Sequence, residues 1–89
     1  MWRELYWNED NEAHIAKHHV TPDEVEEVVN ARPHYVTKGR DESTVVYGQD
    51  AAGRTLLVVL VEAFDGRWYV VTARDMTDAE ARLFRQKGR

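Results

Sequence analysis

The feature that most restricts the fold is a run of six apolar residues from Leu56 to Val61. The run leaves no polar face, which is typical of a strand covered on both sides at the centre of a sheet. Asp65-Gly66 follows it and tolerates the positive φ of a tight hairpin turn, and β-branched and aromatic residues resume from Arg67 to Arg74. Residues 55–74 are therefore predicted to form a β-hairpin.

The second strand of this hairpin ends in a cation. Strand alternation places Val70, Thr72 and Arg74 on one face, opposite to Tyr69 and Val71. A mostly apolar stripe that ends in an arginine marks Arg74 as the first candidate for function.

The composition is that of a single globular domain covering residues 1–89. Of the 89 residues, 43% are apolar and 31% are charged, and no apolar run approaches the roughly 20 residues of a membrane span. The first residues lack the pattern of a secretory signal. The sequence has no cysteine, which excludes disulfides and thiolate metal sites. A cytoplasmic location away from membranes is expected.

Charge is unevenly distributed along the chain. The formal net charge of −4 argues against strong, non-specific binding of nucleic acid, because cations make the contacts with phosphates. Residues 1–30 hold eight acids and two bases, whereas residues 31–89 hold ten bases and eight acids. This distribution of charge therefore allows a basic face on an acidic protein.

Three further strands are expected outside the hairpin. Residues 2–7 suit a first strand, followed by a polar break at 8–11. Residues 34–38 and 43–48 suit two more, joined by a polar turn at 39–42. Four successive strands with short turns predict an antiparallel sheet.

Three helices complete the prediction. Residues 12–18 suit a short helix. Thr21-Pro22-Asp23-Glu24 is a capping box with proline at the first helical position, which predicts a helix to about Asn30. Thr77-Asp78-Ala79-Glu80 is a second capping box that opens a C-terminal helix. The predicted order is β-α-α-β-β-β-β-α, an α+β fold with helices packed against the sheet.

Several short motifs occur in a characteristic order over nearly the whole chain. They are Trp7-Asn8-Glu9-Asp10-Asn11, Lys17-His18-His19-Val20, Gly53-Arg54, and Thr72-Ala73-Arg74 followed by Glu80. Together they resemble the BrnT family of bacterial type II toxins, which share the RelE-like ribonuclease fold.

The resemblance implies the toxin component of a type II toxin–antitoxin system, a metal-independent endoribonuclease that inhibits translation. The implied partners are an RNA substrate and an antitoxin that is often DNA-binding (BrnA-like). Either a homo-oligomer or a toxin–antitoxin heterocomplex is compatible with it, and no cofactor is implied.

The sequence departs from the family pattern at three positions. Family members commonly have glycine in place of His19, many have an arginine at the position of Ser43, and a tyrosine is frequent where this chain has Phe84. These departures keep a second hypothesis open, a non-catalytic protein-interaction module of the same fold.

The candidate catalytic residues are Arg74, His18 and Glu80. Metal-independent cleavage needs a base for the 2′-hydroxyl, a cation for the phosphorane charge and an acid for the leaving 5′-oxygen. Arg74 would supply the cation. His18 matches the family motif near a helix end, where the helix dipole favours a cation, and its alternative role is to cap that helix. Glu80 is implied by the family match, and its alternative role is in its capping box.

Arg54 is a candidate RNA-binding residue. If the hairpin has a two-residue turn, Leu57 pairs with Arg74, and Arg54 lies at the same end of the hairpin. The two guanidinium groups could then share a phosphate. The alternative is that these arginines form surface ion pairs with Asp75 or Glu80.

Lys38 and Arg40 are further candidates for RNA binding, because they flank a polar turn and could contact phosphates. The alternative is a solvated loop. His14 and His18 are four residues apart and would share a helix face, but no third ligand is evident, so a metal site is not expected.

Overall fold

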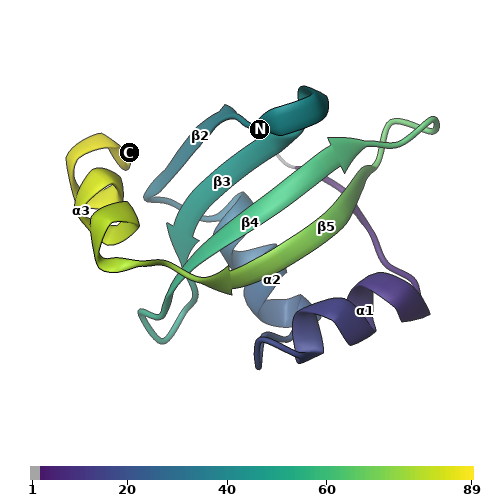
Figure 1. Cartoon of the computed structure of the whole chain (residues 1–89), viewed down its shortest axis with the longest axis horizontal. Helices are drawn as coiled ribbons and strands as arrows, with labels where there is room; N and C mark the ends of the chain where they lie inside the picture. Colours follow the sequence, from purple (N-terminus) through teal and green to yellow (C-terminus); the bar gives the residue numbers. More distant parts are fainter. Residues whose placement is uncertain (1–2) are drawn as a thin grey trace.

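The structure is a computed structural model that describes residues 3–89. The chain forms, in order, β1 (Leu5–Tyr6), α1 (Glu9–Ala16), α2 (Pro22–Asn30), β2 (His34–Lys38), a 3₁₀ turn (Arg40–Glu42), β3 (Thr44–Gln49), β4 (Thr55–Glu62), β5 (Trp68–Asp75) and α3 (Asp78–Lys87). These elements make one five-stranded sheet and three helices, an α+β fold (Figure 1). No helix among the described residues is long and apolar enough to cross a membrane.

The sheet is mixed, with the strand order β1-β5-β4-β3-β2. Strands β2 to β5 are antiparallel neighbours, and β4 is central as predicted. The prediction of a purely antiparallel sheet was wrong for β1, which pairs in parallel with β5. The reason is that α1 and α2 carry the chain from one edge of the sheet to the other, so β1 is left at the free edge of β5. The expected start of β1 at Trp2 lies outside the described residues.

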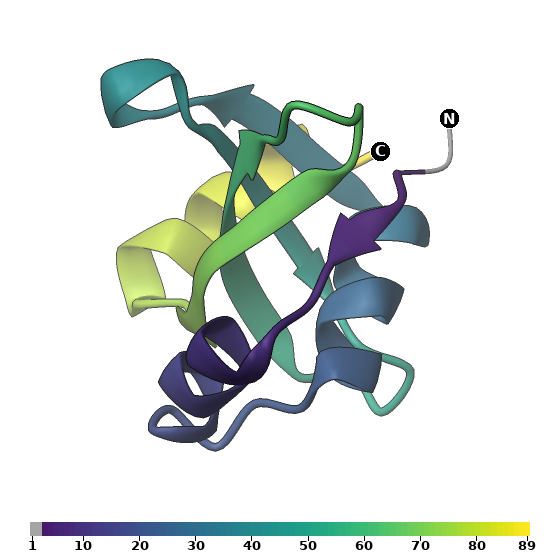
Figure 2. The ribbon, with the colours of Figure 1, turned by 90° about the vertical axis from the view of Figure 1, so that its right-hand side faces the viewer.

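The two faces of the sheet are covered by different helices. Helix α2 lies on one side of the strands and α3 on the other (Figure 2). The main hydrophobic cluster lies on the α2 side and contains Leu5, Ile15, Val20, Val25, Val28, Val29, Val46, Leu56, Val58, Leu60, Val70 and Ala73. Leu57 and Phe84 are also buried but lie outside this cluster. Strand alternation directs Leu57 to the α3 side of the sheet.

The loop between β4 and β5 has three residues, Phe64-Asp65-Gly66, and not the two-residue turn that the sequence suggested. The N–H of Ala63 donates to the carbonyl oxygen of Arg67 at 2.7 Å, and the N–H of Gly66 donates to the carbonyl oxygen of Ala63 at 3.3 Å. Gly66 has a φ of 85°, as expected when a left-handed glycine follows a type I turn.

Strand β5 contains one extra residue, Val71, which forms a bulge opposite β4. Consequently Val70 and Ala73 are both buried in the main cluster although they are three positions apart. The predicted alternation was wrong across this point, because Arg74 projects to the face opposite Val70. The bulge also compensates for the longer loop, so Leu57 pairs with Arg74 as predicted.

Helix α1 begins at Glu9, three residues before the predicted start. The cause is a capping box made by two asparagines: the N–H of Asn11 donates to Oδ1 of Asn8 at 3.0 Å, and the N–H of Asn8 donates to Oδ1 of Asn11 at 2.8 Å. Asn11 is buried, and its Nδ2 also donates to the carbonyl oxygen of Tyr6 at 2.8 Å. The Trp7–Asn11 motif therefore has a structural role in starting this helix.

Candidate functional site

An ion pair between Arg74 and Glu80 lies where β5 passes into α3. Nη1 and Nη2 of Arg74 donate to the two carboxylate oxygens of Glu80 at 2.8 and 2.9 Å, and Nη1 also donates to the carbonyl oxygen of Asp75 at 3.0 Å. The capping box of α3 fixes the acid, because the N–H of Thr77 donates to Oε1 of Glu80 at 2.8 Å. The structure thus brings together two of the three predicted catalytic residues.

The pair holds both groups in their charged forms. The bonds from Arg74, opposed by partial burial, lower the pKa of Glu80 from 4.5 to about 2. The bond to Glu80 in turn raises the pKa of the Arg74 guanidinium. A carboxylate with so low a pKa is a weak base at neutral pH, so Glu80 is better suited to positioning Arg74 than to accepting a proton.

Arg74 still has hydrogen-bonding capacity. A guanidinium has five N–H groups, and Arg74 makes three hydrogen bonds to the described residues, which leaves Nε and one hydrogen of Nη2 without a partner among them. The side chain is 38% exposed. Arg74 can therefore bind an oxyanion without giving up its contact with Glu80.

Tyr47 of β3 completes this site and was missed in the sequence. Tyr47 is paired with Leu57, and Leu57 with Arg74, so the three residues form one row across the sheet. Burial, then the negative charge of Glu80, raises the pKa of Tyr47, which is therefore a protonated phenol at neutral pH. Tyr47 could be assigned to this site from the sequence only if the registers of β3 with β4 and of β4 with β5 were already known.

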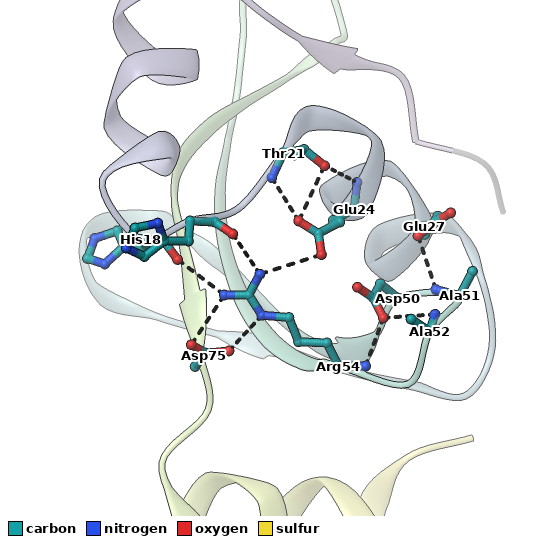
Figure 3. A network of polar contacts seen from close by, with 10 residues as sticks. His18, Thr21, Glu24, Glu27, Asp50, Ala51, Ala52, Arg54 and Asp75 are labelled. Carbon is teal, nitrogen blue, oxygen red and sulfur yellow. Dashed lines mark hydrogen bonds and ion pairs between the residues drawn. The ribbon is translucent and has the colours of Figure 1, made fainter.

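Arg54 lies in a different cluster, where protein atoms occupy all five of its N–H groups (Figure 3). Nε and Nη2 donate to the carboxylate of Asp75 at 2.8 and 3.2 Å. Nη2 and Nη1 donate to the carbonyl oxygens of His18 and His19 at 3.2 and 2.7 Å. Nη1 lies 3.5 Å from the carboxylate of Glu24. The cluster joins the end of α1 to the start of α2 and to β5.

The structure therefore does not place Arg54 and Arg74 around a shared site. Asp75 separates them, since its carboxylate binds Arg54 and its carbonyl oxygen binds Arg74. The hydrogen bond from Arg54 lowers the pKa of Asp75. Each arginine forms an ion pair of the kind given above as the alternative to a shared phosphate site, Arg54 with Asp75 and Arg74 with Glu80.

His18 is the predicted catalytic residue that lies apart from Arg74. It belongs to the Arg54 cluster, and its ring meets that of His14 edge-on with centroids 5.8 Å apart. Nε2 of His14 lies 3.1 Å from the hydroxyl of Thr72. Within residues 3–89, no group of three or more histidine or acidic side chains is arranged to hold a metal ion.

Lys38 and Arg40 lie toward the other end of β2. Lys38 is the last residue of that strand, three positions beyond Tyr35, which corresponds to about 10 Å along a strand. Both side chains are exposed next to the 3₁₀ turn. The structure does not bring them together with Arg74.

Comparison of the chain with family models, with curated proteins and with solved structures found no match.

Proposed function

We propose that this protein is a RelE-like, BrnT-like toxin of a type II toxin–antitoxin system, which cleaves RNA without a metal ion and so inhibits translation. The observation that carries the proposal is the row that places the phenol of Tyr47 near the Arg74–Glu80 pair. The motif order in the sequence supports the same family. The proposed partners are RNA and an antitoxin that blocks this site.

The proposed reaction is an internal transfer within the RNA. The 2′-oxygen of a ribose bonds to the adjacent phosphorus, the bond from phosphorus to the 5′-oxygen breaks, and a 2′,3′-cyclic phosphate and a 5′-hydroxyl result. The two free N–H groups of Arg74 bind the non-bridging oxygens and stabilise their added charge. Tyr47 donates its proton to the leaving 5′-oxygen, and the proton of the 2′-hydroxyl passes to solvent. The Tyr47 phenolate then takes up a proton from solvent, which restores the acid.

Glu80 has a positioning role in this scheme. Its two bonds to Arg74 fix the plane of the guanidinium and leave the free N–H groups in a set direction. A lysine in place of Arg74 would keep the positive charge but would lose the two-point contact with phosphate, because an ammonium group has no fixed plane. Catalysis thus depends mainly on Arg74 and Tyr47.

The test is cleavage of bulk RNA and of ribosome-bound RNA by purified protein in the presence of a chelator. Arg74→Ala and Tyr47→Phe are each expected to slow cleavage about 100-fold or more, because each removes a group that acts in the transition state. Arg67→Ala is the control, since Arg67 pairs with Asp65 at the hairpin loop. Cleavage by folded Arg74→Ala protein at the wild-type rate would contradict the proposal.

The second candidate function is a non-catalytic protein-interaction module of the same fold. Phe64 at the tip of the hairpin is fully exposed, which is unusual for a large aromatic side chain. Val71 is 40% exposed. If folded wild-type protein cleaves neither free nor ribosome-bound RNA, this function replaces the first.

A further inference from the structure

We infer that a cavity between the end of α2 and the end of α3 binds the phosphate backbone of single-stranded RNA. The cavity has a volume of about 560 Å³ and is lined by Arg32, His34, Tyr35, Lys87 and Arg89. It is separate from the Arg74–Glu80 pair, and none of its basic residues was a predicted site residue. The choice of RNA as the ligand rests on the proposed function.

The walls of the cavity are tied together by backbone hydrogen bonds. The N–H of His34 donates to the carbonyl oxygen of Arg89 at 3.1 Å, and the N–H of Arg89 donates to that of His34 at 3.0 Å. Gly88 allows this path, because a Cβ at that position would lie 2.8 Å from the carbonyl oxygen of Phe84 and 2.9 Å from its ring. The chain after α3 is thus held against the edge of β2, with Arg89 at the cavity.

Among the described residues, no acidic side chain lines the cavity. Arg32, Lys87 and Arg89 have basic side chains, and none of them forms an ion pair within residues 3–89. In contrast, Arg54 and Arg74 are each paired with an acid. A sphere of this volume is about 10 Å across, close to the screening length of about 8 Å at physiological ionic strength. The three cations therefore repel one another, and a bound anion would relieve that repulsion.

Two tyrosines connect the cavity to the proposed cleavage site. Tyr35 lines the cavity, and its ring packs against that of Tyr47 with centroids 5.4 Å apart. Tyr35 is also paired with Tyr47 across β2 and β3, so the row extends from Tyr35 through Tyr47 and Leu57 to Arg74. Three strand spacings make this distance about 14 Å.

This arrangement favours a nucleic-acid strand over a small phosphate. A strand whose scissile phosphate is bound by Arg74 could pass the two tyrosines, which offer aromatic rings for stacking with bases. Its next phosphates would then reach Arg32 and Lys87. A free phosphate ion would use the cations but not the tyrosines.

The test is binding of a fluorescent, single-stranded 2′-O-methyl RNA, which lacks the attacking hydroxyl, measured by anisotropy at several salt concentrations. The double variant Arg32→Gln/Lys87→Gln is expected to bind about tenfold more weakly. Its plot of log affinity against log salt should be shallower by about 1.4, or about 0.7 for each lost phosphate contact. Lys17→Gln is the control, since Lys17 is exposed at the end of α1 and lies outside the cavity.

An unchanged affinity and slope in the double variant would overturn the inference, as would binding of inorganic phosphate in place of RNA. The uncleavable RNA separates the two proposals. If the wild type binds this RNA through the cavity but cleaves no natural RNA, the proposed function fails and the binding site stands. If the wild type cleaves RNA and the double variant has unchanged KM and affinity, the cavity inference alone fails.

Discussion

Glu80 acts on both the stability and the electrostatics of the protein. It accepts the capping bond from the N–H of Thr77 and both bonds from Arg74. Because its folded-state pKa, about 2, is below the ordinary value of 4.5, its carboxylate stabilises the fold fully above about pH 4.5. That contribution is lost as the pH falls toward 2.

Glu80→Gln is therefore expected to lower the free energy of unfolding by about 1–2 kcal/mol at pH 7, a value reduced because Arg74 is partly exposed. The difference from the wild type should shrink between pH 5 and pH 2.5, where the Glu80 carboxylate takes up a proton in the unfolded chain while it is still charged in the folded protein. Urea unfolding at pH 7, 5 and 3 measures the loss of stability and its dependence on pH. A difference that does not change with pH would show that the charge of Glu80 contributes nothing, and Glu62→Gln at an exposed strand end is the control.

The candidate site could be predicted from the sequence only where its residues are close together in the chain. Arg74 and Glu80 are six positions apart: the strand pattern made Arg74 a candidate, whereas Glu80 became one through the family resemblance. Tyr47 joins them only through the register of three strands, which local patterns do not determine. Arg54 was assigned to the hairpin end correctly, but its partners lie 21 to 36 positions away in the sequence.

Among the elements, the end of α1 contains a residue in an unfavourable conformation. His19 has a φ of 59°, in the left-handed region that favours glycine. The N–H of Val20 donates to the carbonyl oxygen of Ile15 at 3.2 Å, and the N–H of His19 donates to that of Ala16 at 3.0 Å, which is the pattern of a helix end that glycine usually forms. This is also the position where the BrnT pattern commonly has glycine.

His19→Gly is expected to raise the free energy of unfolding by about 0.5–1 kcal/mol, because relief of the left-handed strain exceeds the added entropy of the unfolded chain. Lys17→Gly is the matched control. Lys17 has a φ of −63°, so the same change two residues earlier should destabilise the protein by about 1 kcal/mol. Thermal or urea unfolding of both variants measures the sign of the change in the free energy of unfolding. Equal destabilisation by both substitutions would exclude strain at His19.

The elements that the sequence predicted well are those with strong local signals. The capping boxes at Thr21 and Thr77 begin α2 and α3 as predicted. The start of α1 was missed because its box uses Asn8 and Asn11, and asparagine is also common in loops. The parallel pairing of β1 depends on the path of the whole chain, and no local pattern encodes it.

At the scale of the whole molecule, Arg54 joins parts of the fold that are distant in the sequence. From its position just before β4, Arg54 contacts the end of α1 through two carbonyl oxygens, the start of α2 through Glu24, and the end of β5 through Asp75 (Figure 3). Its side chain is 28% exposed, so these bonds are partly shielded from water. A planar group with five donors is needed to reach all of these acceptors together.

Arg54→Lys is expected to lower the free energy of unfolding by about 1–3 kcal/mol, because an ammonium group cannot satisfy both carbonyl oxygens and both carboxylates. Arg67→Lys is the matched control, since Arg67 forms an ion pair with the exposed acid Asp65 and lies over the ring of Tyr6, two contacts that an ammonium group can keep. Its unfolding free energy should equal that of the wild type. Urea unfolding of the two variants at pH 7 makes the comparison, and equal values for both would mean that the Arg54 cluster does not hold the helices to the sheet.

The bulge at Val71 has a consequence for insertions and deletions in this hairpin. A two-residue turn with a regular ladder and a three-residue loop with one extra residue on β5 both place Arg74 opposite Leu57. Because Val71 is the unpaired residue, its deletion would leave a regular ladder in which Arg74 still pairs with Leu57. Deletion of one loop residue would leave a two-residue turn and would keep the same pair. The length of the hairpin loop can therefore vary without turning Arg74 to the other face of the sheet.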